Sequence, residues 1–493
     1  MKRVLLNIFF LMVYSKSVSA QNFPFIYSTG MDEVISDVTE DSAGNYFVVG
    51  IKGNFQIPVL GDYTGLLIKL NGMGDSVSSI QYRYNNQVTY FSSVFIADSS
   101  RIIVIGDTFD TLTYSVKILF LELDSNYQVL NEKIIGKDST FQRVLTVNRG
   151  ANDDYLIAGY SSDTTNKLMF YRLSAYGDSL QSAYLSGILS FPLAFSLQEV
   201  PGQNRYVGYA YSYSIGPSFP AVYNEILLLD NTLNVDSVVY VDNSAAIISG
   251  LWQNDTTLIV CTKGYDPNSP PLDWNFRIRR YTNDFMLLSD TMFGAKDTTE
   301  AEAIGPISQS NDGSIYFGGT INYQNNYWGS VPAYFLAVKF DSNLIPIWSR
   351  YVYYNNEYLN LYKVLATNDG GVLLAGTKYN AATANGQERD IYVIKLDSLG
   401  NYVTGTGNSP VAQVHDFIVY PNPAASQLTL QYSPPKATGY ATIYNTLGEA
   451  VHHLILPTGS SHLKVNIAHL PAGLYLIKVE ADGKSGVKRF VRE

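Results

Sequence analysis

The stretch Asn45-Tyr-Phe-Val-Val-Gly50 decides the fold, because variants of it recur along the whole chain. Each copy is an apolar strand that follows a turn of Gly, Asn and Asp and in most copies ends in Gly. The final residues of successive copies are 51 to 57 positions apart. The further copies are Arg101-Ile-Ile-Val-Ile-Gly106, Asp154-Tyr-Leu-Ile-Ala-Gly159, Arg205-Tyr-Val-Gly-Tyr-Ala210, Thr257-Leu-Ile-Val-Cys-Thr262, Ser314-Ile-Tyr-Phe-Gly-Gly319 and Gly371-Val-Leu-Leu-Ala-Gly376.

The segments before and after each copy supply three further strands, so each repeat is a unit of four strands. A second apolar strand follows after a loop, as in Phe335-Leu-Ala-Val-Lys-Phe-Asp341, and a more polar strand comes next. A short apolar segment precedes each copy. Seven units of four strands, each of roughly 50 residues, predict an all-β fold with a seven-bladed β-propeller. An open solenoid or a row of small sandwiches is the alternative.

The two ends of the repeat region argue for a closed ring. The seventh unit ends at Leu399-Gly-Asn-Tyr-Val403 without an outer strand, whereas Asn22-Phe-Pro-Phe-Ile-Tyr-Ser28 precedes the first unit and belongs to none. We expect this N-terminal strand to complete the last blade and close the ring, which would remove two free sheet edges. The propeller is expected over residues 21–405.

The first twenty residues have the order of a secretory signal peptide. Met1-Lys2-Arg3 precedes an apolar run from Val4 to Val13, and Val18-Ser19-Ala20 supplies the small residues that predict cleavage between Ala20 and Gln21. A transmembrane anchor is the alternative, but it needs roughly 20 apolar residues. No later segment is long and apolar enough, so we expect no transmembrane segment in the mature chain.

Composition excludes several kinds of chemistry. All five histidines lie beyond residue 410, so the propeller cannot contain a Ser-His-Asp triad or a histidine-ligated metal site. The lone cysteine, Cys261, lies in an apolar strand and is expected to be buried and inert. A net charge of −10 without a basic stripe argues against nucleic acid as a partner. We expect no cofactor and no metal.

The last part of the chain has its own pattern. Residues 406–414 are small and polar and are expected to form a linker. About seven short alternating strands follow over residues 415–493, which predicts a small Ig-like β-sandwich. Its motifs are Val419-Tyr-Pro-Asn-Pro423, Tyr444-Asn-Thr-Leu-Gly-Glu449 and Leu470-Pro-Ala-Gly-Leu-Tyr-Leu-Ile-Lys-Val479.

These motifs, in this order, resemble the type A sorting domain of type IX secretion cargo in Gram-negative bacteria. A plain adhesion sandwich is the alternative. The resemblance implies that the type IX machinery is a partner and that the protein is secreted or attached to the outer-membrane surface. The residues that carry it are Tyr420, Pro421, Asn422, Pro423, Gly448, Gly473, Tyr475 and Lys478. Residues 22–405 resemble the repeat propellers of large exported bacterial proteins, which have no common activity.

Aromatic side chains gather in the connections between the second and third strands of several units. In a propeller these loops leave the blades on one face, where a binding surface is usually built. We therefore expect a non-enzymatic binding or adhesion module for a glycan or a protein, although the rings could simply pack the loops onto the blades. The candidate ligand-binding residues are Tyr213, Tyr265, Trp274, Tyr327, Trp328 and Tyr379.

Two other functions stay open. Acidic residues near the starts of inner strands would suit a carboxylate-dependent glycan-degrading enzyme. A purely structural surface protein is the other alternative. The acidic candidates are Asp32, Glu33, Glu300, Glu302 and Glu357.

Overall fold

The structure, a computed structural model, forms two compact units, residues 1–404 and 405–493. Each is described by itself. The structure describes residues 23–493 except 55–61, 99, 187–190, 214–221, 242–248, 266–273, 295–299, 324–331, 356, 381–387, 404–416, 433, 437–438, 446–449 and 482–483. One 3-10 turn, Tyr84–Asn86, interrupts described regular structure that is otherwise β-strand.

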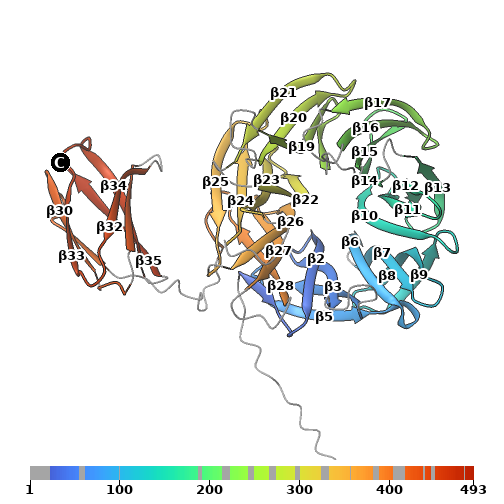
Figure 1. Cartoon of the computed structure of the whole chain (residues 1–493), viewed down its shortest axis with the longest axis horizontal. Helices are drawn as coiled ribbons and strands as arrows, with labels where there is room; N and C mark the ends of the chain where they lie inside the picture. The colour runs from blue at the N-terminus through green and yellow to red at the C-terminus, as the bar shows by residue number, and fades with distance from the viewer. Residues whose placement is uncertain are drawn as a thin grey trace, which may run out of the picture. The chain divides into compact units, whose positions relative to one another are not determined.

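The first unit is the predicted seven-bladed β-propeller (Figure 1). Each blade is an antiparallel sheet of four strands, ordered from the channel outward as they follow one another in the chain. The first three blades are β2 (Asp32–Glu40), β3 (Tyr46–Gly53), β4 (Thr64–Leu70) and β5 (Ser76–Tyr82); β6 (Val88–Asp98), β7 (Arg101–Asp110), β8 (Ser115–Asp124) and β9 (Val129–Ile135); and β10 (Phe141–Arg149), β11 (Tyr155–Ser162), β12 (Asn166–Leu173) and β13 (Ser179–Leu185).

The remaining blades follow the same order, and only the seventh takes its outer strand from elsewhere in the chain. They are β14 (Phe191–Glu199), β15 (Arg205–Tyr213), β16 (Val222–Asp230) and β17 (Val235–Val241); β18 (Ser249–Asn254), β19 (Thr257–Tyr265), β20 (Trp274–Thr282) and β21 (Leu287–Phe293); β22 (Glu300–Gln309), β23 (Ile315–Ile321), β24 (Tyr334–Phe340) and β25 (Pro346–Val352); and β26 (Tyr358–Ala366), β27 (Val372–Tyr379), β28 (Arg389–Leu396) and β1 (Phe25–Tyr27).

The N-terminal strand closes the ring, as the sequence predicts. β1 pairs antiparallel with β28, with Phe25 opposite Val393 and Tyr27 opposite Ile391. Phe23 and Phe25 are each 1% exposed and join one apolar cluster with side chains of blades 1 and 7. The closure therefore consists of both backbone hydrogen bonds and buried aromatic surface.

The glycine that ends the repeated stretch lies opposite a β-bulge in the neighbouring inner strand. The register shifts between Ile35 and Asp37 in β2, and inner strands of other blades carry a corresponding bulge. The bulge brings a carbonyl oxygen against the glycine, so an added Cβ atom would overlap it. The overlapping pairs are Gly50 with Val34, Gly106 with Tyr90, Gly159 with Arg143 and Gly376 with Asn360.

The turns between the third and fourth strands link neighbouring blades. Each is a five-residue turn whose fourth residue has a positive φ. In blades 4, 5 and 6 this residue is Leu233, Phe285 or Leu344, and its side chain is buried against the preceding blade. In blade 3 it is Gly177, and the ring of Phe120 from blade 2 fills the space.

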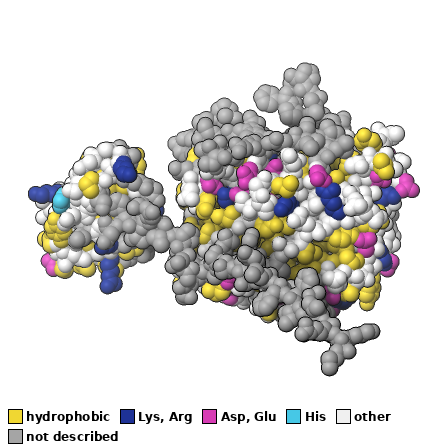
Figure 2. Space-filling model, turned by 90° about the horizontal axis from the view of Figure 1, so that it is seen from below, with side chains coloured by type: hydrophobic (Ala, Val, Ile, Leu, Met, Phe, Trp, Pro, Cys, Tyr) yellow, Lys and Arg dark blue, Asp and Glu magenta, His cyan; other side chains and the backbone are white. Residues whose placement is uncertain are grey.

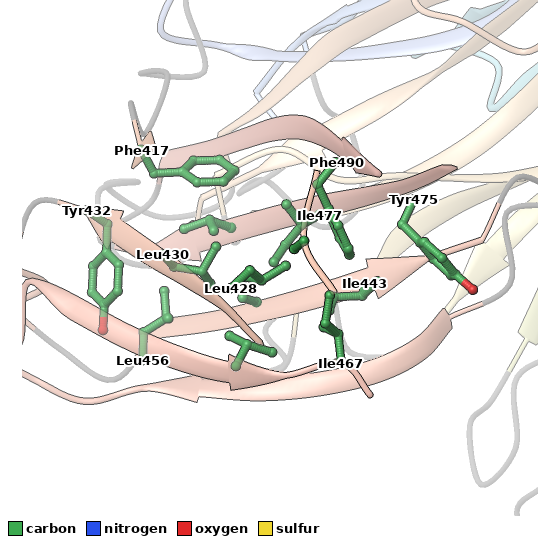
Figure 3. Packing of buried hydrophobic residues seen from close by; sticks show 14 of the residues in the cluster. Phe417, Leu428, Leu430, Tyr432, Ile443, Leu456, Ile467, Tyr475, Ile477 and Phe490 are labelled. Atoms are coloured by element: carbon green, nitrogen blue, oxygen red, sulfur yellow. The ribbon is translucent and has the colours of Figure 1, made fainter. Parts of the chain in front are cut away.

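The second unit is the predicted small β-sandwich, and the seven strands that the structure describes in it form two sheets. One inner face presents Leu428 and Leu430 to Ile443 and Ile477 of the other sheet, and Phe490 lies in the same core (Figure 3). The sheets are β29 (Phe417–Tyr420), β30 (Gln427–Tyr432) and β33 (His462–Asn466); and β32 (Ala450–Leu456), β31 (Gly439–Tyr444), β34 (Gly473–Ala481) and β35 (Lys484–Arg492).

Closure predicts a specific loss of stability. Phe25→Ala removes a fully buried ring from the joint between blades 7 and 1 and is expected to lower the free energy of unfolding by about 3–5 kcal/mol. Urea denaturation of the full chain measures this. The control is Met31→Ala, because Met31 is 46% exposed a few residues further along and its loss is expected to cost about 0.5 kcal/mol or less. Equal losses in the two variants would contradict the assigned role of β1.

Candidate functional site

The long loops of the propeller leave its blades on one face. Antiparallel order puts the connections from the second to the third strand, and from each blade to the next, at the same ends of the strands. We call this the loop face and the opposite one the turn face. The second-to-third connections are short in blades 2 and 3, at residues 111–114 and 163–165, and longer in the other five.

The predicted aromatic residues lie at this loop face where the structure describes them. Tyr213 ends β15, and Tyr265 and Trp274 form a cross-strand pair at the ends of β19 and β20. Tyr379 ends β27 and is only 5% exposed, packed with Ala333 and Tyr358. Tyr327 and Trp328 lie outside the described residues.

Three tyrosines that the sequence interpretation missed form an exposed cluster on blade 6. The ring centroids of Tyr334 and Tyr353 are 4.4 Å apart, and Tyr351 lies 5.6 Å from Tyr334. Tyr351 is 43% exposed and Tyr353 is 60% exposed. Tyr334 directly follows the loop that contains Tyr327 and Trp328. The signal available in the sequence was the run Tyr351-Val-Tyr-Tyr354.

A stacked arginine lies between blades 2 and 3 near the same face. The Arg143 guanidinium carbon is 3.9 Å from the ring centroid of Tyr90, and its Nη1 donates to Asp107 at 2.9 Å. The same carboxylate accepts the Val144 N–H, and burial raises the pKa of Asp107 to about 6. The arginine is thereby fixed in position with 29% of its side chain exposed.

The acidic candidates of blades 1 and 7 belong to a buried polar cluster. Lys378 Nζ lies 2.7 Å from Asp390 and 3.1 Å from Glu357, whose other oxygen accepts a hydrogen bond from Asn380. Asp32 accepts the N–H of Arg389 at 3.0 Å. The Glu357 and Asp390 carboxylates are therefore neutralised within blade 7, and the Asp32 contact links blade 1 to blade 7.

Glu33 is the member of this cluster whose negative charge has the fewest close partners. Its side chain is fully buried, accepts a hydrogen bond from Thr29 and lies 3.9 Å from Lys52, while its Oε2 has no partner among the described residues. Burial raises the pKa of Glu33 to about 7. The side chains of Glu300 and Glu302, on β22, lie outside the described part of the structure.

The inner strands of several blades line a cavity of about 60 Å³ to which Ser and Thr contribute several side chains. Lys363 reaches Asp37 across a blade joint at 2.9 Å. Over the described ranges, no three His, Cys, Asp or Glu side chains come together as metal ligands. Cys261 is buried in the core. On the wall shown in Figure 2, acidic and basic side chains lie among one another, so neither sign forms a continuous field.

The sorting-type motifs of the second unit hold its last strand in place. Asn422 accepts the N–H of Val491 at 2.8 Å and donates to the carbonyl of Arg489 at 3.2 Å. Tyr475 donates to the carbonyl of Pro471 and stacks on Phe490. Tyr420, Pro421, Pro423 and Gly473 are exposed, Lys478 is half-buried, and Gly448 lies outside the described residues.

The pKa of Glu33 predicts a pH-dependent effect. The fold raises this pKa from 4.5 to about 7, so the folded state favours protonated Glu33. The stability that depends on this protonated form is fully present below pH 4.5 and is lost as the pH rises through 7. Glu33→Gln copies the protonated form, so it is expected to stabilise the chain at pH 8, by about 1–3 kcal/mol, and to change little at pH 4. Denaturation at both pH values measures this. Glu357→Gln is the control, because it removes a partner of Lys378 and should stabilise at neither pH.

The Asn422 contacts predict local opening of the C-terminal strand. Asn422→Ala removes both hydrogen bonds and is expected to speed amide exchange along β35 by about tenfold, since each bond contributes about 1 kcal/mol. Hydrogen exchange of the full chain measures this. Gln431→Ala changes an exposed residue of β30 and is the control. Equal amide exchange along β35 in the two variants would show that the Asn422 hydrogen bonds do not hold this strand.

Comparison with solved structures gives similarities of low identity. A protein of unknown function from Bacteroides caccae is 12% identical with a TM-score of 0.34, covering 58% of this chain and 89% of that one. The β-propeller domain of the Trilobed protease from Pyrococcus furiosus is 11% identical with a TM-score of 0.43, covering 80% and 98%. Pyrococcus horikoshii acylaminoacyl peptidase is 10% identical with a TM-score of 0.42, covering 83% and 58%. Such similarities are not evidence of a shared activity.

A search of curated proteins finds no match for the chain. The specific match comes instead from a family model and lies in the second unit. None of the helical structure in the described residues is long and apolar enough to cross a membrane. Residues 418–493 match the family model for a secretion system C-terminal sorting domain. The predicted resemblance is therefore confirmed for this unit: residues 418–493 are a type IX sorting domain, and the chain is an exported β-propeller protein, secreted or held at the cell surface.

Proposed function

We propose that this exported propeller is a non-enzymatic binding or adhesion module whose loop face recognises a glycan or a protein. The observation that carries the proposal is the exposed cluster of Tyr334, Tyr351 and Tyr353 beside the long loop of blade 6. The blades of the propeller hold the three tyrosine side chains in place before any ligand binds, and this lowers the entropic cost of binding.

The chemistry of the cluster favours a sugar among the possible ligands. Exposed tyrosine rings present flat apolar faces that stack on the C–H faces of a pyranose, and their hydroxyls can bond to sugar hydroxyls. Rings with centroids 4.4 to 6.4 Å apart contact one another, so together they form one continuous aromatic surface against which a sugar unit could stack. Tyr265 and Trp274, on blade 5, are paired along the backbone at the same face.

The enzyme alternative is weaker. Glu33 is fully buried, and Glu357 and Asp390 both bind Lys378. A glycosidase needs two carboxyl groups that reach the glycosidic bond, whereas these groups are buried and two of them are bound to a lysine.

The rest of the chain serves delivery in this proposal. A signal peptide, residues 1–20, would be removed between Ala20 and Gln21, which leaves β1 close to the new N-terminus. The propeller would span residues 21–405, a linker residues 406–414 and the sorting domain residues 415–493. The type IX machinery would then release the protein or attach it to the outer membrane.

A glycan array tests the proposal. The mature chain is compared with Tyr351→Ala/Tyr353→Ala and with Trp274→Ala/Trp328→Ala, and each pair is expected to lower the signal on the bound glycans by about tenfold or more, since stacking contributes about 1 kcal/mol per ring. Tyr176→Ala removes an exposed tyrosine from a turn of blade 3 and is the control. Glycan cleavage that Glu300→Gln or Glu302→Gln abolishes would favour the enzyme. Binding that both aromatic pairs leave intact would refute the proposal.

A further inference from the structure

A pocket of about 690 Å³ opens on the turn face, opposite the aromatic loops. It lies between the first-to-second turns of blades 3 and 4 and the inner strand of blade 5. Turn length explains it. The blade 4 turn is one residue longer than the blade 3 turn, because Val200 bonds to Arg205 whereas Gly150 bonds to Asp154. The blade 5 turn is short, with Asn254 paired to Thr257. The blade 4 turn therefore extends further than the blade 5 turn beside it, and the half-buried Trp252 lines the pocket between them.

Carboxamides dominate the lining of this pocket. Asn148 and Gln198 bond to backbone carbonyls of the next blade, at Leu197 and Gly250, and so fix the floor. Three further side chains, from Asn152, Gln203 and Asn204, have no hydrogen-bond partner among the described residues. A carboxamide donates and accepts at once, which matches the paired donor and acceptor character of vicinal hydroxyl groups.

Trp252 supplies an aromatic wall. Its ring lines the pocket and makes an edge contact with Phe285, with the centroids 6.3 Å apart. Its buried Nε1 has no hydrogen-bond partner in the part of the chain that the structure describes. The indole N–H is therefore enclosed by the protein, and the part of Trp252 that lines the pocket is its apolar surface.

The charged groups at the rim are already paired. Arg149 lies 2.9 Å from Asp153, and Glu199 accepts the N–H of Ala151 at 2.8 Å. No cation at this rim is left to attract an anion, within the residues described. The pocket therefore suits an uncharged ligand rich in hydroxyl groups.

We infer that this turn-face pocket is a second binding site, specific for a neutral oligosaccharide of about two or three units. Its volume lies within the range of roughly 300–1,000 Å³ usual for small-ligand sites. The part of the Trp252 ring that lines the pocket and three carboxamides would then contact the sugar. The inference is independent of the proposed function of the loop face.

Titration of the mature chain with maltotriose, mannotriose and chitotriose, followed by heat and by tryptophan fluorescence, tests this site. At least one sugar is expected to bind saturably below about 20 mM, and trigalacturonic acid is expected to bind more weakly. Gln203→Ala/Asn204→Ala is expected to weaken binding by about tenfold or more. Trp252→Phe keeps a ring against Phe285 and is expected to remove the fluorescence change. Asn343→Ala, in an exposed turn of blade 6, is the matched control.

The variants separate this site from the loop face. Tyr351→Ala/Tyr353→Ala is expected to leave trisaccharide binding unchanged. Loss of binding in that variant, with retention in Gln203→Ala/Asn204→Ala, would place the sugar on the loop face and overturn the inference. Absence of saturable binding by all three neutral sugars, or tighter binding of the acidic one, would also overturn it.

Discussion

The collision between a Cβ atom and a bulged inner strand is the constraint on which the propeller depends. At Gly50, Gly106, Gly159 and Gly376 the bulge presses a carbonyl oxygen into the space that a side chain would need. The bulge adds twist to the inner strand and directs an extra residue, such as Ser36, toward the channel. The recurring glycine therefore records a close contact in four of the seven blades, whereas blade 4 accommodates Ala210 opposite the corresponding bulge.

Contact between blades is maintained by different side chains in different places. Leu233, Phe285 and Leu344 hold positive φ values that cost about 1 kcal/mol or more each, and burial against the preceding blade offsets that cost. At Gly177 the strain is absent, and Phe120 of the neighbour fills the gap. The volume at the joint is thus filled in each case, although the residue that fills it changes.

Local patterns made the fold predictable. The seven blades were predicted from the repeat period, the turn residues and the apolar runs. The closing strand was predicted from the segment around Phe25, which belongs to no repeat unit. Both predictions depend only on residues that are neighbours in sequence. The sandwich and its sorting motifs followed for the same reason. The site was less predictable. Tyr379 is aromatic and follows the expected pattern, yet it is buried, because its surroundings come from Ala333 and Tyr358 on other strands.

Features assembled from distant residues could not be read from the sequence. Tyr334 joins Tyr351 and Tyr353 only because β24 and β25 are paired, and the turn-face pocket depends on a one-residue difference between turns about 50 positions apart. Such differences barely disturb the repeat, since each turn is closed by its own hydrogen bonds and the strands keep their register. A propeller can therefore change what its faces bind while the bulge and its glycine keep the ring intact, and this separation explains why the repeat predicts the architecture so well and the ligand so poorly.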